Sequence, residues 1–488
     1  MALNRVTETS TLNLQVRPGG DMALMRGIAK ILFELSEHDD DAIDKAFIDA
    51  YTHGVEEYRR VVESTSWDQS IEQSGIPYEQ ILQAAQIYRE SEKTVISWCL
   101  GVTQHEHAVD QIREIVNVLL LRGNIGRLGA GPSPVRGHSN VQGNRTCGVT
   151  HRPTEPFLKK LDELYGISAP RHHGLDTVDT INAMDQGRVK VFVSMGGNFV
   201  TAAPDTTLTM RAMAQCDLTV QVSTKLNRSH IVHGRQALIL PCLGRTEKDV
   251  QQSGEQCVSV EDAFAMVHAS WGMKRPASEH LRSEIAILTG MARATLPESA
   301  ISWEGFCADY DVIRHDMAQV LPGFEDFSSR VREPHDFRIA QPARRRDFSP
   351  ADHGMANFSA AQLPVMDLAE DELVLGTMRS HDQWNTTIYS NHDRYRGVRN
   401  IRTLIFMNPE DMCARGLSDG DLVDITATSV TGNQRRLKKY RVFSYDLPPR
   451  SASGYMPEMN VLIGVEDYST QSDQPLMKSV RVRVTTAA

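Results

Sequence analysis

The sequence predicts an α/β multidomain protein that ends in an all-β domain. A short apolar run, TVISWCL at 94–100, ends at Gly101 and precedes a helical stripe over 109–120, which is the strand–loop–helix order of a βα unit. Further apolar runs at 190–195, 218–222 and 237–240 predict the strands of a second α/β segment, and we expect the runs at 94–100, 218–222 and 237–240 to be buried. After residue 361, alternating runs such as DLVDITAT and SVRVRVT predict short strands, with a turn at Asp419-Gly420.

The length of 488 residues is too great for one core, so we expect several units. The patterns place α/β domains at 1–137 and 138–250, a helical segment and linker at 251–360, and the β domain at 361–488. In the first domain, Asp21 is the predicted N-cap of a helix through Leu35, and a second helical stretch reaches Phe47. Residues 260–321 read as helical, and the Pro-, Arg- and Asp-rich run 330–361 reads as a connection.

Composition excludes several classes of function. A formal charge of −10 argues against a nucleic-acid or anionic-membrane surface. No apolar run approaches the ~18 residues of a membrane span, and the N-terminus lacks the apolar region of a signal peptide, so we expect a cytoplasmic location. The seven cysteines are scattered singly, without the Cys-x-x-Cys spacing of a metal site, so we expect no metal ligands and no iron–sulfur cluster in this chain.

The run 119–148, LLLRGNIGRLGAGPSPVRGHSNVQGNRTCG, is the most informative segment. It holds seven glycines, four arginines and three asparagines directly after an apolar helix. Glycine lets the backbone approach a ligand closely, arginine suits phosphates and carboxylates, and amides suit the edge of a heterocycle. Composition alone leaves two interpretations equal: a ligand-binding loop or a long surface loop between domains.

The order of residues in this run resembles the loop that lines the molybdenum and pterin site in the molybdopterin oxidoreductases of the formate dehydrogenase and dimethyl sulfoxide reductase superfamily. The segments GVTQHEHAVDQI, FVSMGGNF and NPEDMCARGLSDGDLVDI follow in that superfamily's order. The segment QVSTKLNRSHIVHGRQALILPCLGRTEKDVQ resembles the formate-dehydrogenase-like bacterial alpha subunits linked to acid resistance. The resemblance covers nearly the whole chain, which looks like the C-terminal two-thirds of a member.

The resemblance implies an α/β multidomain fold whose C-terminal domain is a double-psi β-barrel-like domain that binds molybdopterin dinucleotide. It implies a bis(molybdopterin guanine dinucleotide) molybdenum cofactor and two-electron redox of formate or another small substrate. The 4Fe-4S cluster and the protein ligand to molybdenum would lie N-terminal to everything matched. We therefore expect the 1–137 domain to be incomplete, an N-terminal companion chain or redox partner, and sheet surface left uncovered.

Two residues of the glycine-rich run are the catalytic candidates. Pro134 stiffens the approach to Arg136 and Gly137 frees the chain after it, which would hold one guanidinium in a fixed place. The matching arginine of formate dehydrogenases orients the small carboxylate substrate. His138 stands where the family commonly has a glutamine, so another small substrate stays open beside formate. The alternative for Arg136 is a salt-bridged loop arginine.

The resemblance assigns cofactor contacts to several glycine, amide and hydroxyl residues. For His105 a helix cap is the equal alternative, for Gly-Gly-Asn at 196–198 an ordinary turn, and for Lys478 a surface lysine at a strand start. The second histidine of the family's barrel motif is replaced here by Gln383 or Trp384. The predicted contacts are Gly101, Thr103, Gln104, His105, Asn140, Gln142, Gly197, Asn198, Asp205, Thr224, Asn227, Gly376, Thr377, Arg379, His381, Gln383, Asn385, Thr386, Glu458, Asn460 and Lys478.

Two other functions are weighed beside a molybdenum oxidoreductase. An NAD-type dehydrogenase fits poorly, because no Gly-x-Gly-x-x-Gly follows a strand with an acidic residue about 20 positions on. A non-catalytic remnant that binds the pterin nucleotide or a partner remains open.

Overall fold

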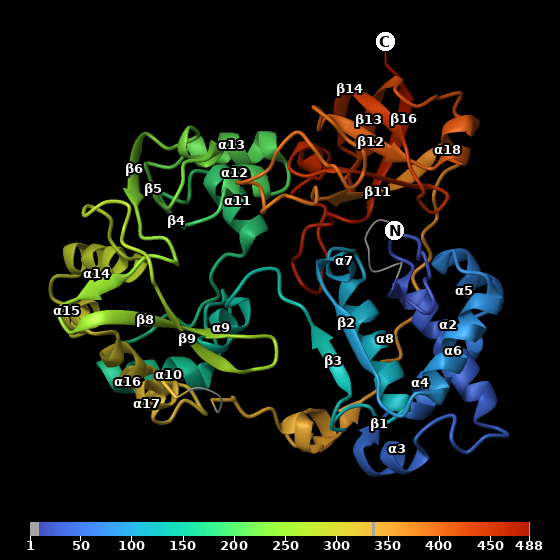
Figure 1. Ribbon diagram of the computed structural model, residues 1–488, viewed down its shortest axis with the longest axis horizontal. Coiled ribbons are helices and arrows are strands. Elements are labelled where there is room, and N and C mark those ends of the chain that lie inside the picture. Colours follow the sequence, from blue (N-terminus) through green and yellow to red (C-terminus); the bar gives the residue numbers. More distant parts are fainter. Residues whose placement is uncertain (1–8, 334–336, 488) are drawn as a thin grey trace. The chain divides into compact units, whose positions relative to one another are not determined.

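The computed structural model describes residues 9–333 and 337–487 and divides the chain into two compact units. Unit 1 contains the described chain up to Pro134, the segment Thr201–Thr207, and the chain from Pro342 onward. Unit 2 contains Val135–Val200 and the described part of Leu208–Gln341. Figure 1 labels their elements. Residues 1–8, which belong to the N-terminal segment without the apolar pattern of a signal peptide, lie outside the described residues. The domain boundaries predicted at 137, 250 and 360 stay a prediction.

Unit 1 begins with helices packed around α2 (Asp21–Leu35). The N-cap of α2 is Gly20 and not the predicted Asp21, which is the first helical residue. A Cβ at Gly20 would lie 2.4 Å from the Gln73 carbonyl oxygen, so only glycine fits where the chain enters the helix. The other helices are α3 (Lys45–Tyr51), α4 (Val55–Ser64), α5 (Trp67–Ser74), α6 (Tyr78–Glu90), α7 (Leu100–Thr103) and α8 (Ala108–Leu121).

The first predicted strand forms, but it is not buried. Strand β2 (Val95–Trp98) pairs in parallel with β3 (Gly131–Pro134), which the glycine-rich run supplies. Val95 is 53% exposed because, in the part of the chain that the structure describes, β2 has β3 as its one neighbour. A second short parallel pair joins β1 (Thr52–His53) to β10 (Ala356–Asn357). The predicted stripe on α8 does face the core of unit 1.

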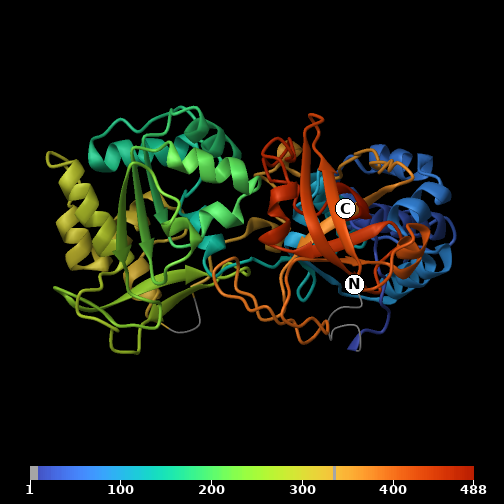
Figure 2. The same ribbon diagram turned by 90° about the horizontal axis from the view of Figure 1, so that it is seen from above.

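The C-terminal part of unit 1 is a closed six-stranded barrel, drawn in orange and red in Figure 2. Its strands follow the spatial order β11 (Glu372–Met378), β15 (Ser451–Tyr455), β12 (Leu404–Met407), β14 (Gln434–Ser444), β13 (Leu422–Thr428) and β16 (Val480–Thr486). The pairs β11–β15 and β12–β14 are parallel and the other neighbouring pairs are antiparallel. Alternate residues such as Val423, Ile425 and Ala427 fill the interior. The predicted C-terminal barrel is confirmed. Helix α18 (Pro409–Ala414) and the 3₁₀ turn η4 (Glu458–Leu462) connect its strands.

Unit 2 contains a parallel sheet in the order β4 (Val191–Met195), β5 (Leu218–Ser223), β6 (Gln236–Pro241), which confirms the predicted strands. The expected burial of the run at 237–240 was wrong, because β6 is an edge strand: Leu238 and Ile239 are 49% and 45% exposed. Val191, Val193 and Met195 on β4 are exposed as well, whereas β5 between them is largely buried. Its helices and turns are α9 (Val141–Thr146), α10 (Glu155–Tyr165), α11 (Thr177–Asp185), α12 (Phe199–Ala202), α13 (Thr206–Ala214) and η1 (Arg228–His230), of which α12 and α13 run into the Thr201–Thr207 segment.

The predicted helical segment at 260–321 begins with strands. An antiparallel sheet is formed by β7 (Asp249–Gln251), β8 (Gly254–Glu261) and β9 (Val267–Trp271). The helix prediction failed here because the Asp262 carboxylate accepts hydrogen bonds from the backbone N–H groups of Phe264 and Met266, which closes a hairpin turn. Helices follow as predicted in α14 (Glu284–Thr295), α15 (Trp303–Ala308), α16 (Tyr310–Val320) and α17 (Phe327–Arg330), and the connection holds η2 (Pro342–Arg345) and η3 (Asp352–Gly354).

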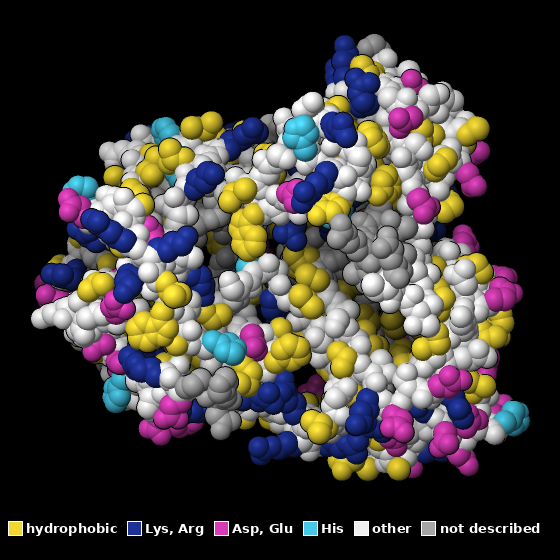
Figure 3. All heavy atoms as spheres, in the orientation of Figure 1, with side chains coloured by type: hydrophobic (Ala, Val, Ile, Leu, Met, Phe, Trp, Pro, Cys, Tyr) yellow, Lys and Arg dark blue, Asp and Glu magenta, His cyan; other side chains and the backbone are white. Residues whose placement is uncertain are grey.

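The surface is mixed in charge. Basic and acidic side chains are interspersed, with apolar side chains between them, on the face that Figure 3 shows. Among the described residues, no helix has the length and apolar character needed to cross a bilayer.

Candidate functional site

Three predicted motifs of unit 1 meet around Lys478. Its backbone N–H donates to the Gln104 carbonyl oxygen at 3.1 Å, and its ammonium group donates to the Thr377 carbonyl oxygen. Burial and the nearby Arg379 charge lower the pKa of Lys478 to about 8. Lys478 is therefore not the freely solvated surface lysine of the alternative interpretation. Residues from 104, 377 and 478 lie together although the sequence separates them widely.

His105 lies behind this contact and lines a cavity. It is 5% exposed, and burial lowers its pKa to about 4, so the imidazole is neutral near pH 7. The N-cap of α8 is His107, so His105 is not the helix cap of the alternative interpretation. The other predicted residues of this motif are less enclosed: Gly101 is exposed, and Thr103 and Gln104 are half-buried.

The cavity beside His105 opens to solvent, and the empty space among its lining residues is about 620 Å³ with the open solvent included. Four buried polar atoms on its lining residues have no hydrogen-bond partner in the part of the chain that the structure describes: Arg17 Nε, His105 Nδ1, Gln111 Oε1 and Ser479 Oγ. Buried polar atoms without partners are rare in folded proteins, and a cluster of them around one cavity indicates a polar ligand. Sequence reasoning found His105 here but did not single out Arg17, Gln111 or Ser479, although Gln111 lies within the segment GVTQHEHAVDQI and Ser479 begins SVRVRVT.

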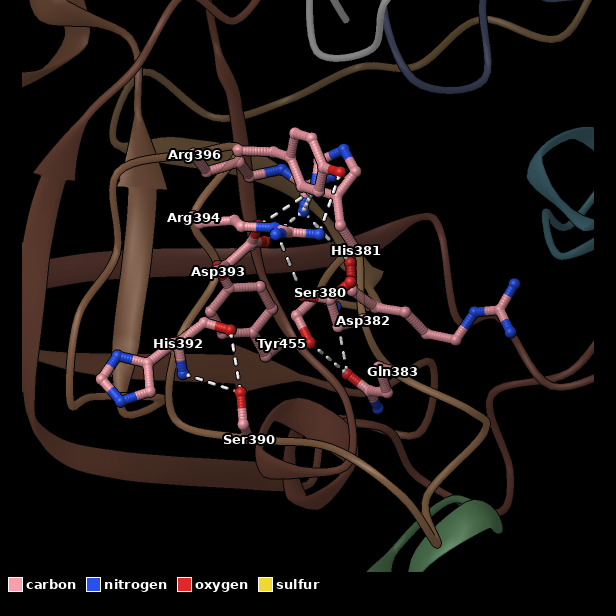
Figure 4. Close-up of polar contacts among 12 residues, drawn as sticks. Ser380, His381, Asp382, Gln383, Ser390, His392, Asp393, Arg394, Arg396 and Tyr455 are labelled. Carbon is pink, nitrogen blue, oxygen red and sulfur yellow. Dashed lines mark hydrogen bonds and ion pairs between the residues drawn. The ribbon is translucent and has the colours of Figure 1, made fainter.

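A second polar cluster lies on the barrel at the predicted motif around His381 (Figure 4). Asp393 is 1% exposed and accepts hydrogen bonds from His381 Nδ1 at 2.9 Å, Arg396 at 2.5 Å and the Tyr455 hydroxyl at 3.0 Å. Burial acts to raise the pKa of Asp393, but the hydrogen bonds from Arg396 and His381 outweigh it and lower the pKa. The ring of Tyr395 packs on His381 with centroids 4.5 Å apart. The charged carboxylate thus fixes the orientation of the imidazole.

Gln383 in the same loop is turned toward the protein. Its Oε1 accepts from Arg402 at 3.0 Å and from the Ser380 backbone at 3.0 Å, and its Nε2 donates to the Met456 carbonyl at 2.8 Å. Arg402 also holds Glu458 through two hydrogen bonds of 2.7 and 3.1 Å. Arg402 therefore links the loop that contains Gln383 to the turn that contains Glu458. The neighbouring Asn385 and Thr386 lie in the same loop, and Thr386 is buried.

Asn460 and Asp205 join two further segments of unit 1. Asn460 is fully buried, and its Nδ2 donates to the Thr201 carbonyl at 2.9 Å, while its Oδ1 has no partner among the described residues. The Asp205 carboxylate pairs with Arg435 at 2.7 Å, and its backbone N–H donates to the Ile463 carbonyl. Both predicted residues therefore fasten the Thr201–Thr207 segment to the turn that follows the barrel strand β15.

Arg136 in unit 2 is exposed and is held by Gln142. The Gln142 Oε1 accepts from Arg136 Nε at 2.9 Å and from a second guanidinium nitrogen. Asn140, with φ of 65°, accepts from the Glu261 backbone at 3.0 Å, and His138 is exposed nearby in the sequence. Within the described chain a neutral amide thus holds the Arg136 guanidinium, and the substrate role of Arg136 stays a prediction.

The two predicted nucleotide loops of unit 2 meet at the carboxyl ends of β4 and β5. Asn227 Nδ2 donates to the Gly197 carbonyl at 2.6 Å, and the Ser229 hydroxyl donates to Asn198 Oδ1 at 2.8 Å. Gly197 has a φ of 74°, which favours glycine. Thr224 is exposed at the start of the second loop. Ligands of parallel α/β sheets bind at this end of the strands. The predicted nucleotide contacts of these loops stay a prediction.

Comparison with known proteins gives the family. The molybdopterin oxidoreductase profile matches residues 4–249, and the molydopterin dinucleotide binding domain profile matches 373–481. An uncharacterized oxidoreductase of Mycobacterium tuberculosis, Rv2900c, is 46% identical over 478 residues, covering 96% of this chain and 61% of the relative. Protein YdeP of Escherichia coli K12 is 39% identical over 495 residues, covering 99% and 65%.

Two more distant matches are a formate dehydrogenase subunit and a solved structure. The F420-dependent formate dehydrogenase subunit alpha of Methanocaldococcus jannaschii is 28% identical over 219 residues, which is 44% of this chain and 32% of that protein. The solved structure of acetylene hydratase from Pelobacter acetylenicus shares the fold, with a TM-score of 0.65 and 12% identity over 99% of this chain and 72% of that one. The chain spans 61% to 65% of the length of the two curated relatives named above. On the match over half its length, the chain belongs to the molybdopterin oxidoreductase family.

Proposed function

We propose that this chain holds a bis(molybdopterin guanine dinucleotide) cofactor within a formate-dehydrogenase-like oxidoreductase that acts on formate or another small anion. The observation that carries the proposal is the cavity beside His105, where four buried polar atoms have no partner among the described residues. Both regions matched by family profiles contribute to its lining, through His105 and Ser479.

The donor set fits a pterin. Arg17 Nε can only donate and Gln111 Oε1 can only accept, whereas His105 Nδ1 and Ser479 Oγ can do either. A pterin edge alternates donors and acceptors, so it satisfies such a mixed set better than a simple anion does. When bound, the molybdenum cofactor supplies the two-electron redox chemistry, and the chain supplies position, charge and exclusion of water. Lys478 adds a positive charge that suits the phosphates of a dinucleotide.

Arg136 is the proposed substrate-binding group. Its guanidinium is exposed on the loop and offers the planar fork that matches a carboxylate. Support for formate comes from the similarity to a formate dehydrogenase subunit and from the family loop in which Arg136 stands. His138 beside it would distinguish this substrate site from one that carries glutamine. A redox partner or companion chain, the iron–sulfur cluster, the cytoplasmic location and the link to acid resistance stay predictions.

Metal and nucleotide analysis tests the proposal. The whole protein encoded by the gene, purified from cells that make molybdenum cofactor, should contain molybdenum near one per chain. Mild acid hydrolysis should release GMP, near two per molybdenum, together with a fluorescent oxidised pterin. CMP in place of GMP would overturn the guanine form alone, and protein without molybdenum or pterin would overturn the proposed cofactor.

A further inference from the structure

A buried carboxylate lies beneath the loop that carries Arg136. Glu261 ends strand β8 in unit 2 and is 4% exposed. Neither of its carboxylate oxygens makes a hydrogen bond of ordinary geometry to any described residue. A charged group in such a place is costly unless its surroundings compensate for the lost water, so its presence calls for a physical explanation.

The groups that surround Glu261 come from the glycine-rich run. Its backbone N–H donates to Asn140 Oδ1 at 3.0 Å, which fastens the end of β8 to the loop. Burial raises the pKa of the Glu261 carboxyl and Asp262 acts in the same direction, whereas the Thr146 hydroxyl, the Gln142 amide and the Arg136 charge favour its ionised form. The carboxylate in turn raises the pKa of Cys147, after burial, which is the larger cause. Glu261 lies against helix α9, where a Cβ on Gly143 would come to 3.3 Å from the Glu261 Cβ.

Gln142 connects this carboxylate to Arg136. Its amide oxygen accepts two guanidinium hydrogen bonds, so its NH₂ end is left to face other groups. The Gln142 side chain is among the groups that lower the pKa of Glu261, so it favours the charged carboxylate. A flipped amide would set its NH₂ against the guanidinium and its oxygen against the carboxylate, which is repulsive at both ends. The carboxylate thus selects the amide orientation that holds Arg136.

We propose that Glu261 is a positioning residue for Arg136, acting through the amide of Gln142. The inference deepens the proposed function, since it rests on Arg136 as the group that binds the substrate anion. Glu261 does not itself bind substrate in this arrangement. Its charge fixes which end of Gln142 meets the guanidinium, and so fixes where the planar fork points.

Stability separates positioning from a structural role. A carboxyl whose pKa is raised on folding adds stability that is fully present below its unfolded pKa and is lost as pH rises through the folded value. Where Glu261 is ionised it therefore opposes folding. Glu261→Gln removes this opposition while keeping the shape, so its melting temperature should equal or exceed that of the unaltered protein. A purely structural ion would show the reverse.

The kinetic test uses the molybdenum-loaded whole protein. Glu261→Gln should lower kcat/KM by about tenfold or more, because misplacing a binding group by about 1 Å costs on the order of 10²-fold. Glu255→Gln is the matched control, since Glu255 lies on the same strand β8, is exposed and pairs with Lys248. Gln142→Ala and the double variant Gln142→Ala/Glu261→Gln should have equal rates, because the second change has nothing left to act on.

A readout without turnover uses the chain with ¹⁵N-labelled arginine. The Arg136 Nε–H signal, assigned by its loss in Arg136→Lys, should move or broaden in Glu261→Gln and stay in place in Glu255→Gln. An unmoved signal, or effects of Gln142→Ala and Glu261→Gln that simply add, overturns the positioning role. If Arg136→Lys leaves turnover unchanged while the signal still responds to Glu261→Gln, the substrate role of Arg136 fails and the positional link stands.

Discussion

Arg402 donates two hydrogen bonds to Glu458, 2.7 Å from Nε to Oε1 and 3.1 Å from Nη2 to Oε2. The Arg402 side chain is 5% exposed. This two-pronged pair joins the loop that begins near Ser380 to the 3₁₀ turn η4. Both segments were predicted to contact the cofactor. The Arg402 and Glu458 side chains bind each other, and the cofactor contact of Glu458 stays a prediction.

Glu458→Gln should lower the free energy of unfolding of the barrel by about 2 kcal/mol, because it leaves the buried Arg402 short of its counter-charge. Asp371→Asn is the control, since Asp371 forms an exposed pair with Arg483 and should change stability by less than about 0.5 kcal/mol. Urea unfolding of the two variants measures both values. If Glu458→Gln is as stable as the unaltered protein but no longer binds cofactor, Glu458 contacts the cofactor directly.

His105 should make stability depend on pH in the acid range. Its folded pKa of about 4 lies below the unfolded value of 6.5, so the unfolded chain binds the proton more readily. Stability is then complete above pH 6.5 and is lost as pH falls toward 4. The drop in urea midpoint between pH 7 and pH 5 should shrink in His105→Gln. His280→Gln, at an exposed histidine, should leave the drop unchanged.

Much of the fold could be predicted, because local patterns decide it. The strands β4, β5 and β6 and the barrel strands follow from short apolar or alternating runs. The strands β8 and β9 were missed because one side chain, Asp262, turns the chain where periodicity reads as helix. Burial of β2 and β6 was wrong because the sequence pattern does not reveal whether a strand has neighbours on both sides.

The sequence predicted where the site residues lie better than it predicted which side chains they contact. The motifs place Gln104, Thr377 and Lys478 in one neighbourhood, and the structure brings them together. Asp393, Arg402 and Glu261 escaped notice because a lone charged residue between motifs carries no local signal. Their importance follows from three-dimensional contact with His381, Glu458 and helix α9.

Cofactor binding should weaken in mild alkali through Lys478. Its pKa of about 8 means that the ammonium loses its charge above that pH, whereas an ordinary lysine keeps it to about 10.5. The affinity for the proposed anionic cofactor should fall by about tenfold between pH 7 and pH 9. Lys478→Gln should be weak at both pH values, and Lys438→Gln, on an exposed barrel strand, should behave as the unaltered protein.

The exposed sheet of unit 2 should bind a hydrophobic dye. Val191, Val193 and Met195 lie on one face of β4 at 53%, 43% and 44% exposure, and such contiguous apolar surface is a docking or aggregation site. Val191→Thr with Val193→Thr keeps the β-branched shape and should reduce dye fluorescence by about half. Ile231→Thr removes an exposed residue outside the sheet and should change little. An equal loss of dye fluorescence in Val191→Thr/Val193→Thr and in Ile231→Thr would show that the dye does not bind on β4.

Arg136→Lys should damage turnover and spare the fold. Lysine keeps the positive charge but loses the planar fork, so it cannot bind a carboxylate at two points. It also cannot donate two aligned N–H groups to Gln142 Oε1, as Arg136 does. The expected fall in kcat/KM is on the order of 10²-fold, with unchanged melting temperature and molybdenum content. Arg145→Lys is the matched control, because Arg145 is exposed on α9, three residues after Gln142, and makes a long 3.5 Å contact to the Val149 carbonyl. Equal activity of the two variants would remove Arg136 from the substrate site, whereas a loss of molybdenum in Arg136→Lys would assign it to the cofactor.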